Sequence, residues 1–368
     1  MTDRKLTILH TEASKGWGGQ EIRILDESDG LRRRGHDVRI AGVGGTPLAD
    51  AAKKRGIPFH EMPIDKRSLK ALSSLRRVIK EIDPDVIVTH SSTDSWVTAA
   101  ACLFRRRPAV VRVRHLGFQV ASGFVNRWLY GSVPSHVVTT GKATRNMLVG
   151  TLRLKPENVT SIPTGIDTER YKPGDKMRSR TQTGLIAKNF VIGIVATLRV
   201  GKGHRFLVSA LEDPRLKEAT LVIVGDGPQE ANLRAQVSEL GLNERVVFAG
   251  RQQDVVPWLQ SFDAFALPSV AIEGAPQAVM QAMAAGVPTV VTPVGAIPEL
   301  VQDGKSGLFV NVSDATALAD AFSRIQGDPA LAERLSNEAR AFAEARCTIA
   351  HMLDMMEDVL WKSAPPRG

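Results

Sequence analysis

The sequence has little cysteine, few aromatic residues and no long apolar run. Of its 368 residues only Cys102 and Cys347 are cysteines, too few and too far apart for a disulfide framework or a thiolate metal site, so we expect a reducing, cytoplasmic compartment. No stretch of about 18 apolar residues occurs, and the start MTDRKLTILHTE lacks a signal-type apolar core, which predicts a soluble protein. Aromatic residues make up 5% and do not interleave with basic stretches, which argues against a nucleic-acid partner.

Positive charge is concentrated in the first half of the chain. The net charge is +9, and the excess of Lys and Arg lies within residues 1–180, whereas the second half is weakly acidic. Basic clusters such as Arg32 to Arg34 and Arg105 to Arg107 could attract an anionic membrane surface, which would place the protein on the inner face of the cytoplasmic membrane. Two of the basic clusters end predicted helices, where cations favour the helix dipole without any partner. Both interpretations remain open.

Strands alternate with helices along the whole chain, which predicts an α/β protein with parallel, doubly wound sheets. The length suits two domains. A polar stretch, YKPGDKMRSRTQTG, separates two such series and reads as a linker. We therefore predict an N-terminal domain over 1–172, a linker over 173–187, a C-terminal domain over 188–348, and a final helix within 349–368 that could pack back on the first domain.

The segment EGAPQAVMQAMAAGVPTVV, which begins at Glu273, is the most informative one. It follows the apolar run Ala264 to Leu267, and its own apolar residues recur at helical spacing until Gly286. We expect a helix start at Gly274 to Pro276, whose unpaired N–H groups and dipole would bind a diphosphate. Glu273, just before that start, is a natural acceptor for sugar hydroxyls.

Other candidates lie where strands end, because ligands of open parallel sheets bind at the carboxyl ends of strands. Gly18 and Gly19 follow the first strand, where they either let a ligand approach the backbone or form a tight turn that needs positive φ. Arg199 and Lys202 follow a buried strand in VATLRVGKGHRF, and His90 and His115 end two further strands. The loop VGDGPQEANL lacks the third glycine of the dinucleotide fingerprint, so we assign its glycines a turn role.

Together these residues resemble glycosyltransferase family 4, the retaining nucleotide-sugar transferases of GT-B fold. The similarity rests on the order and spacing of GGQE, RRRGHDV, IPTGID, ATLRVGKGH, LVIVGDGPQEANL, VVFAGRQQDV, DAFALPS and EGAPQAVMQAMAAGVPTVV. It implies two Rossmann-like domains that face across a cleft, with the nucleotide held mainly by the second domain and the acceptor by the first.

The resemblance also implies roles for single residues. Gly19 matches the glycine loop over the diphosphate, Lys202 the phosphate-binding lysine, His115 the histidine near the sugar, and Glu273 the first acid of the family's Glu-x7-Glu motif. Two positions depart from the pattern: the second acid is Gln281, and the usual arginine is Thr197, with Arg199 two positions later. These changes bear on donor geometry and on the choice of nucleobase.

The resulting prediction is a metal-independent enzyme without a cofactor that transfers a sugar from a nucleoside diphosphate sugar to a glycan or lipid-linked acceptor, with retention, in lipopolysaccharide or polysaccharide biosynthesis. A GT-B epimerase or hydrolase and a non-catalytic nucleotide-sugar-binding protein remain alternatives. The predicted catalytic residues are Glu273, Lys202, Arg199 and His115; the predicted donor-binding residues are Gly19, Arg199, Lys202, Glu273, Gly274, Ala275, Pro276 and Gln281; the predicted acceptor-binding residues are Gly18, His90 and His115.

Overall fold

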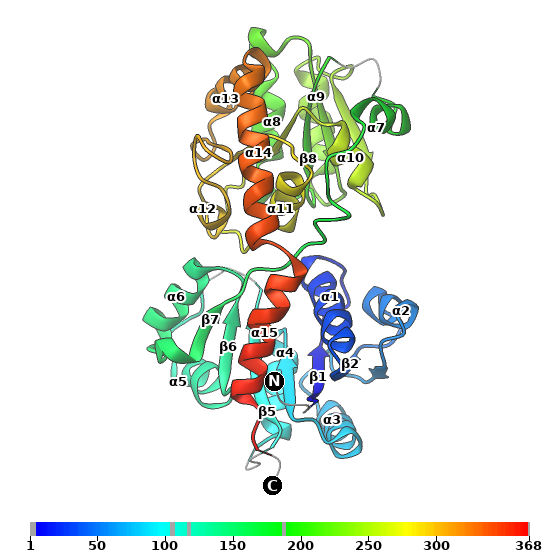
Figure 1. Cartoon of the computed structure of the whole chain (residues 1–368), viewed down its shortest axis with the longest axis vertical. Coiled ribbons are helices and arrows are strands. Elements are labelled where there is room, and N and C mark those ends of the chain that lie inside the picture. The colour runs from blue at the N-terminus through cyan, green and yellow to red at the C-terminus, as the bar shows by residue number, and fades with distance from the viewer. Residues whose placement is uncertain (1–4, 104–106, 116–118, 186–188, 367–368) are drawn as a thin grey trace. The chain divides into compact units, whose positions relative to one another are not determined.

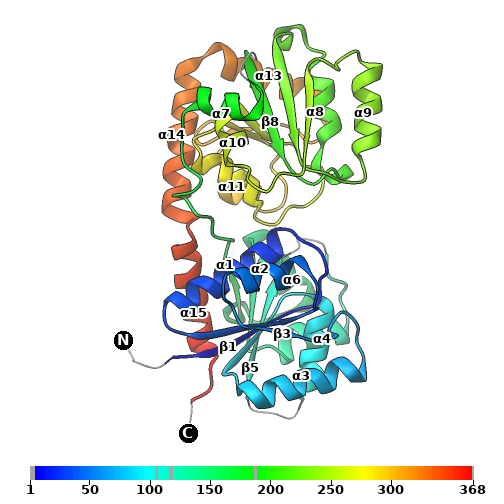
Figure 2. The ribbon, with the colours of Figure 1, turned by 90° about the vertical axis from the view of Figure 1, so that its right-hand side faces the viewer.

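The chain divides into two compact units, each built on one parallel sheet. The structure is a computed structural model that describes residues 5–103, 107–115, 119–185 and 189–366. Unit 1 comprises residues 1–165 and 349–368, and unit 2 comprises residues 166–348. Helices lie on both faces of each sheet (Figures 1 and 2). Both units therefore have the doubly wound, Rossmann-like architecture that the sequence predicts.

The sheet of unit 1 has seven strands in the order β3-β2-β1-β4-β5-β6-β7, all parallel. Its strands are β1 (Thr7–Glu12), β2 (Asp37–Gly42), β3 (Phe59–Glu61), β4 (Val86–Thr89), β5 (Ala109–Arg114), β6 (His136–Thr139) and β7 (Val159–Ser161). Its helices are α1 (Gly19–Arg33), α2 (Pro47–Lys54), α3 (Leu69–Ile82), α4 (Ser92–Ala101), α5 (Phe124–Arg127), α6 (Lys142–Leu152) and α15 (Ile349–Ser363), with short helices η1 (Trp128–Ser132) and η2 (Pro156–Asn158). Alternate residues of the strands face opposite layers: Ile8 packs in the cluster that contains α15, and Leu9 packs against α3 and α4.

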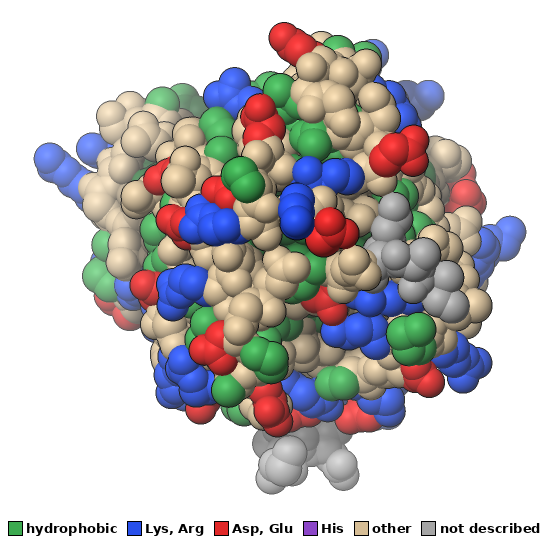
Figure 3. Space-filling view, turned by 90° about the horizontal axis from the view of Figure 1, so that it is seen from above, with side chains coloured by type: hydrophobic (Ala, Val, Ile, Leu, Met, Phe, Trp, Pro, Cys, Tyr) green, Lys and Arg blue, Asp and Glu red, His purple; other side chains and the backbone are tan. Residues whose placement is uncertain are grey.

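The sheet of unit 2 has six strands in the order β10-β9-β8-β11-β12-β13, again all parallel. Its strands are β8 (Phe190–Val195), β9 (Ala219–Val224), β10 (Val246–Gly250), β11 (Ala264–Leu267), β12 (Thr289–Val291) and β13 (Leu308–Phe309). Its helices are α7 (Lys176–Thr183), α8 (His204–Ala210), α9 (Glu230–Glu239), α10 (Val256–Ser261), α11 (Gln277–Ala284), α12 (Ile297–Leu300), α13 (Ala315–Gly327) and α14 (Pro329–Arg346), with short helices η3 (Val200–Lys202) and η4 (Pro214–Leu216). On the face that Figure 3 shows, Lys and Arg side chains are interspersed with Asp and Glu.

The boundary between the units differs from the predicted one. The division falls at Gly165 and Ile166, and the predicted linker 173–187 contains helix α7, which packs within unit 2. Arg180 of this helix donates from Nε to the carbonyl of Ser261 at 3.1 Å and pairs with Asp263. The segment is polar because it is held by side-chain hydrogen bonds to a distant part of the chain, so its composition resembled that of a linker.

The final helix, α15, belongs to unit 1. Its buried residues Met352, Leu353, Met356, Val359 and Leu360 recur at helical spacing and form one apolar stripe in the core of that unit. Gly30 of α1 allows a close approach, since a Cβ atom there would lie 2.3 Å from Cδ1 of Leu353. The chain thus returns to the first unit through this stripe.

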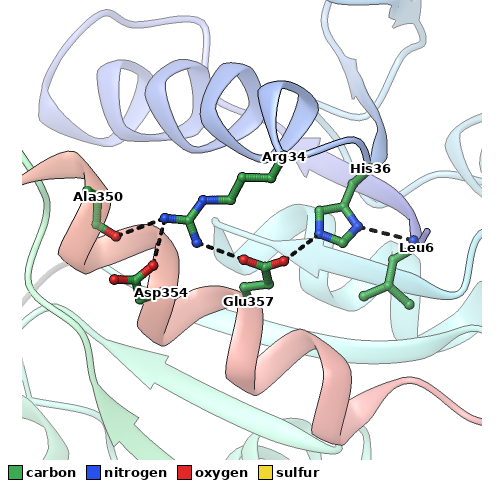
Figure 4. Close-up of polar contacts among 6 residues, drawn as sticks. All are labelled: Leu6, Arg34, His36, Ala350, Asp354 and Glu357. Atoms are coloured by element: carbon green, nitrogen blue, oxygen red, sulfur yellow. Dashed lines mark hydrogen bonds and ion pairs between the residues drawn. The ribbon is translucent and has the colours of Figure 1, made fainter. Parts of the chain in front are cut away.

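Polar contacts beside the stripe hold α15 to the end of α1 (Figure 4). The guanidinium of Arg34 donates to Glu357 and to Asp354, each at 2.7 Å. His36 accepts a hydrogen bond from the backbone N–H of Leu6 at Nδ1, so its Nε2 carries the proton that is donated to Glu357 at 2.9 Å. In this part of the molecule, the basic cluster that includes Arg34 is used for internal ion pairs.

Candidate functional site

In unit 2, Lys202 and Glu273 meet at the carboxyl ends of strands β8 and β11. The ammonium of Lys202 lies 2.6 Å and 2.8 Å from the two carboxylate oxygens of Glu273. The hydroxyl of Ser269 donates to the same carboxylate at 2.5 Å. The Lys202 side chain is 27% exposed and that of Glu273 is 12% exposed, so both can still reach a ligand. Two residues 71 positions apart in the sequence thus form an ion pair at the edge where parallel sheets bind ligands.

Backbone contacts fix the loops that carry this pair. The carbonyl of Gly201 accepts from the N–H of Val270 at 2.9 Å, which joins the loop after β8 to the loop after β11. Gly203 has φ +76, and a Cβ there would lie 1.9 Å from the carbonyl oxygen of Pro268. Gly295 has φ +61, and a Cβ there would lie 2.1 Å from the carbonyl oxygen of Glu273. Only glycine allows both the positive φ and the close backbone contact, so these two positions determine where Lys202 and Glu273 lie.

The helix after Glu273 begins later than the sequence predicts. Helix α11 starts at Gln277, and Pro276 is its N-cap residue with φ −72 and ψ 113, so the expected start at Gly274 to Pro276 is corrected. Proline has no N–H group, and the first helical N–H groups come from Gln277 and Ala278. Gly274, Ala275 and Pro276 form the turn that leads from Glu273 into this helix, whose second turn carries the half-buried Gln281.

Arg199 lies on the same loop as Lys202 but in a different environment. It is the N-cap residue of η3 and is exposed, and Thr197 beside it is exposed too. Within the described part of the chain, no hydrogen bond joins the Arg199 guanidinium to Glu273. The structure therefore brings Lys202 and Glu273 together and leaves Arg199 directed to solvent from the same loop.

In unit 1, the glycine loop after β1 is extended. Gly18 is the N-cap residue of α1 with φ −169 and ψ −162, and Gly19 is the first residue of the helix. A Cβ at Gly18 would make an ordinary contact, 3.7 Å from Oε2 of Glu21. The alternative of a tight turn that needs positive φ is therefore wrong for Gly18, whose φ lies outside the left-handed region.

Glu12, at the end of β1, is fully buried and bound to the same loop. Its carboxylate accepts the N–H of Ser14 at 2.7 Å and a hydrogen bond from the side-chain amide of Gln20. Burial, and after it the nearby charge of Asp94, raises the pKa of Glu12 from its ordinary value of 4.5 to about 8. This carboxyl group is therefore protonated over much of the neutral range.

Three histidines form a hydrogen-bonded row across β1, β4 and β5, which are neighbours in the sheet. Nδ1 of His10 lies 2.9 Å from Nε2 of His90, and Nδ1 of His90 lies 2.9 Å from Nε2 of His115. His10 and His90 are 0% and 4% exposed, whereas His115 is half-buried. His90 is thus buried with both ring nitrogens engaged, so its expected contact with an acceptor is corrected to a contact with His115.

Asp94, the third residue of helix α4, is hydrogen-bonded to the ends of the strands that carry His10 and His90. Its carboxylate accepts the hydroxyl of Thr11 at 2.9 Å and the backbone N–H of His90 at 2.8 Å. With Ser91 it also forms the capping box of α4. The end of β1 and the end of β4 are therefore fixed to the start of one helix.

Family models match both units of the chain. A model described as "Glycosyltransferase Family 4" covers residues 17–170, and one described as "Glycosyl transferases group 1" covers residues 189–328. The chain belongs to glycosyltransferase family 4. It is therefore a glycosyltransferase, as the motifs predict, and the resemblance stated from the sequence is confirmed.

Relatives and solved structures extend over nearly the whole chain. The "UDP-Gal:alpha-D-GlcNAc-diphosphoundecaprenol alpha-1,3-galactosyltransferase" of Escherichia coli is 24% identical, with 90% of each chain covered. The "N-acetyl-alpha-D-glucosaminyl L-malate synthase" of Bacillus anthracis is 26% identical, with 88% of each covered. The Anabaena protein HepE in complex with UDP-glucose superposes with a TM-score of 0.86 at 23% identity, covering 97% of this chain and 100% of that one. A glycosyltransferase from Rickettsia africae superposes with a TM-score of 0.88 at 18% identity, covering 99% of this chain and 100% of that one. These structures establish the GT-B fold.

The sequence of this family 4 enzyme did not indicate several residues that the structure places beside the predicted ones. His10 was not proposed, although the three adjacent strands end alike, in TILH, VIVTH and VRVRH. Ser269 and Gly295 were also missed, because their contacts with Glu273 depend on how loops after different strands meet. Within residues 5–103, 107–115, 119–185 and 189–366, no three His, Cys, Asp or Glu side chains gather as a metal site. No helix of the described chain is long and apolar enough to span a membrane.

Proposed function

We propose that this enzyme transfers a sugar from a nucleoside diphosphate sugar to a hydroxyl of a glycan or lipid-linked acceptor of the cell envelope, with retention of anomeric configuration. The observation that carries the proposal is the Lys202–Glu273 pair at the carboxyl ends of β8 and β11 in a family 4 chain. The pair places a cation that suits a diphosphate 2.6 Å from a carboxylate that suits sugar hydroxyls.

The pair suits the charges that change during transfer. As the bond between the anomeric carbon and the diphosphate oxygen breaks, negative charge grows on that oxygen, and the ammonium of Lys202 stabilises it. The acceptor oxygen forms the new bond on the same face of the sugar, and its proton passes to the departing diphosphate. Glu273 accepts hydrogen bonds from the donor sugar. The exposed Arg199 and the first N–H groups of α11 add positive potential at the diphosphate.

Uridine diphosphate sugars are the first donors to test. The printed name of the E. coli relative contains UDP-Gal and a diphosphoundecaprenol acceptor, and the Anabaena structure contains UDP-glucose. We therefore propose a UDP-sugar donor and a lipid-linked diphosphate acceptor. We also propose that the protein reaches this acceptor through weak attraction of its basic first half to an anionic bilayer.

A thermal-shift screen of UDP-, GDP- and ADP-sugars tests donor binding. A ligand present at 100 times its dissociation constant stabilises the folded protein by about 2.7 kcal/mol, which is easily measured. The donor that binds is then incubated with and without a lipid-linked acceptor, and the anomeric configuration of the product is read by NMR. Product formed only with acceptor supports transfer. Donor hydrolysis or epimerisation without acceptor favours the hydrolase or epimerase alternative, and binding without turnover favours the binding protein.

Two finer points are tested in the same assay. Because Lys202 supplies the charge that a divalent cation would otherwise provide, we propose that turnover is unchanged by EDTA; a loss that Mg²⁺ restores would contradict metal independence. Co-sedimentation with vesicles of anionic phospholipid, compared with vesicles of phosphatidylcholine, tests the membrane attraction. Equal recovery on both would end that part of the proposal.

A further inference from the structure

The row of histidines in unit 1 is joined by hydrogen bonds rather than by ring stacking. Ring centroids of His10 and His90 are 5.2 Å apart and their planes differ by only 16°; for His90 and His115 the values are 5.2 Å and 30°. The centroid separation exceeds the 2.9 Å between the facing nitrogens by about one ring diameter, so the rings follow one another edge to edge. Each contact therefore consists of one N–H group and one lone pair.

Such a row has only two arrangements when all three rings are neutral. In the first, every ring carries its proton on Nδ1, so His10 donates to His90, and His90 donates to His115. In the second, every ring carries its proton on Nε2, and donation runs the other way. Neutral rings are expected, because burial lowers the pKa of His10 to about 3 and lowers those of His90 and His115 well below the ordinary value.

The buried end of the row decides between these arrangements. Among the residues that the structure describes, none is a hydrogen-bond partner of Nε2 of His10 or of Nη2 of Arg23, and both nitrogens are buried. Arg23 is fully buried, its positive charge acts on His10, and its pairing is with Glu27 at 3.3 Å and the carbonyl of Ile162 at 2.8 Å. An N–H on Nε2 of His10 would be an unsatisfied buried donor near a guanidinium. A bare lone pair there leaves no donor unsatisfied and is favoured by the positive charge of Arg23, which acts on His10.

We propose that His10 and His90 are positioning residues that hold His115 in the Nδ1–H tautomer, so that His115 presents an N–H donor, not a base, at the carboxyl end of β5. An unsatisfied buried donor shifts such an equilibrium by roughly 5- to 150-fold, so the Nδ1–H form dominates. The tautomer itself follows from the row alone. What His115 then does for a ligand rests on the proposed function: it donates a hydrogen bond to an oxygen of the sugar or diphosphate.

Ring-selective NMR of the full chain tests the proposal without any ligand. The protein is labelled with ¹⁵N-histidine, and long-range ¹H–¹⁵N correlations show which nitrogen of each of the eight histidines carries the proton. Signals of the row are assigned by their loss in His10→Phe, His90→Phe and His115→Phe. We expect Nδ1–H for all three rings in the unmodified protein. An Nε2–H signature or a charged ring at His115 overturns the proposal.

Three variants separate a tautomer effect from a merely structural one. His10→Phe removes the first donor and should lower the Nδ1–H to Nε2–H ratio at His115 by at least about fivefold. His10→Asn keeps an amide donor near the position of Nδ1, toward Nε2 of His90, so it should retain the unmodified signature. His136→Phe is the matched control, because His136 begins β6 at the amino end of the sheet and bonds Thr160 at 2.8 Å. An unchanged His115 signature in His10→Phe would refute the role of His10. If His10→Phe does not fold, the unmodified spectrum and His10→Asn still decide.

Failure of this proposal and failure of the proposed function are distinguishable. The NMR signature needs no donor and no acceptor, so a chain without transferase activity could still show Nδ1–H at His115. Conversely, transferase activity together with Nε2–H at His115 would support the proposed function and contradict this inference.

Discussion

Replacing Lys202 by Met removes the ammonium and keeps most of the aliphatic stem. In the folded protein the change leaves Glu273 without its partner at 2.6 Å, but the carboxylate keeps the Ser269 hydroxyl at 2.5 Å and remains in reach of water. Because the Lys202 side chain is 27% exposed, the pair is partly screened, and pairs of this kind contribute about 0–1 kcal/mol to stability. We therefore expect the free energy of unfolding to fall by less than about 1 kcal/mol.

The effect on transfer should be much larger than the effect on stability. If the ammonium stabilises the charge that grows on the departing diphosphate, its removal costs about 2.7–4 kcal/mol in the transition state, or roughly 100- to 1000-fold in turnover. The assay measures release of nucleoside diphosphate with the donor that the thermal-shift screen selects, and urea unfolding of the same samples gives the stability.

Lys176→Met is the matched control in the same unit. Lys176 pairs with Asp263 at 2.9 Å, and Asp263 immediately precedes β11, so this ion pair lies at the amino end of the strand whose carboxyl end leads to Glu273. Its removal should leave turnover unchanged. Turnover of Lys202→Met within threefold of the unmodified enzyme would refute the phosphate role. A loss shared equally by both variants would show that the effect is general and not tied to the site.

Three further predictions concern other parts of the chain. Gly30→Ala should lower the free energy of unfolding by about 1–3 kcal/mol despite better helix propensity, because its Cβ would lie 2.3 Å from Leu353; Leu353→Ala in the same background should recover part of the loss in urea unfolding. The carboxyl of Glu12 has a pKa of about 8 in the folded protein and an ordinary value of 4.5, so the folded state binds more protons, and stability should fall between about pH 5 and pH 8. Glu12→Gln should flatten this decline, and parallel slopes for the two proteins would contradict the assignment. His115→Asn, which keeps an N–H group near the position of Nδ1, should retain turnover within about tenfold, whereas His115→Phe should lose at least about a hundredfold; equal losses would argue against a donor role.

The regular elements were predictable wherever a local pattern encodes them. Strand β11 coincides with the apolar run Ala264 to Leu267, and helix α11 lies within the segment after Glu273 whose apolar residues recur at helical spacing. Helix α7 was not predicted, because the sequence analysis assigned its residues to a linker. It is only eight residues long and carries almost no apolar residues, since contacts with Asp263 and Gln260 hold it.

The site was predictable as a set of positions but not as a set of contacts. The sequence placed Lys202, Glu273 and His115 at the carboxyl ends of strands, since ligand binding at that edge is a general property of parallel sheets. It gave no information that Lys202 and Glu273 pair directly, or that His90 lies between two other rings. Such contacts depend on strand order, and β1, β4 and β5 are adjacent only because the chain crosses over between them.

The glycines of unit 2 explain how a site assembled from separate loops can still be rigid. The loop after β12 approaches Glu273 through Gly295, while the N–H of Ala296 donates to the carbonyl of Glu273 at 3.0 Å. The loop after β8 approaches Pro268 in the same way through Gly203. Because these contacts are made by backbone, the position of the Glu273 main chain does not depend on the rotamers of neighbouring side chains. Gln281 lies on the helix of this frame and Thr197 on the loop after β8, and neither takes part in the backbone contacts that hold Glu273. Under the proposed function, donor specificity can therefore vary independently of the Lys202–Glu273 pair.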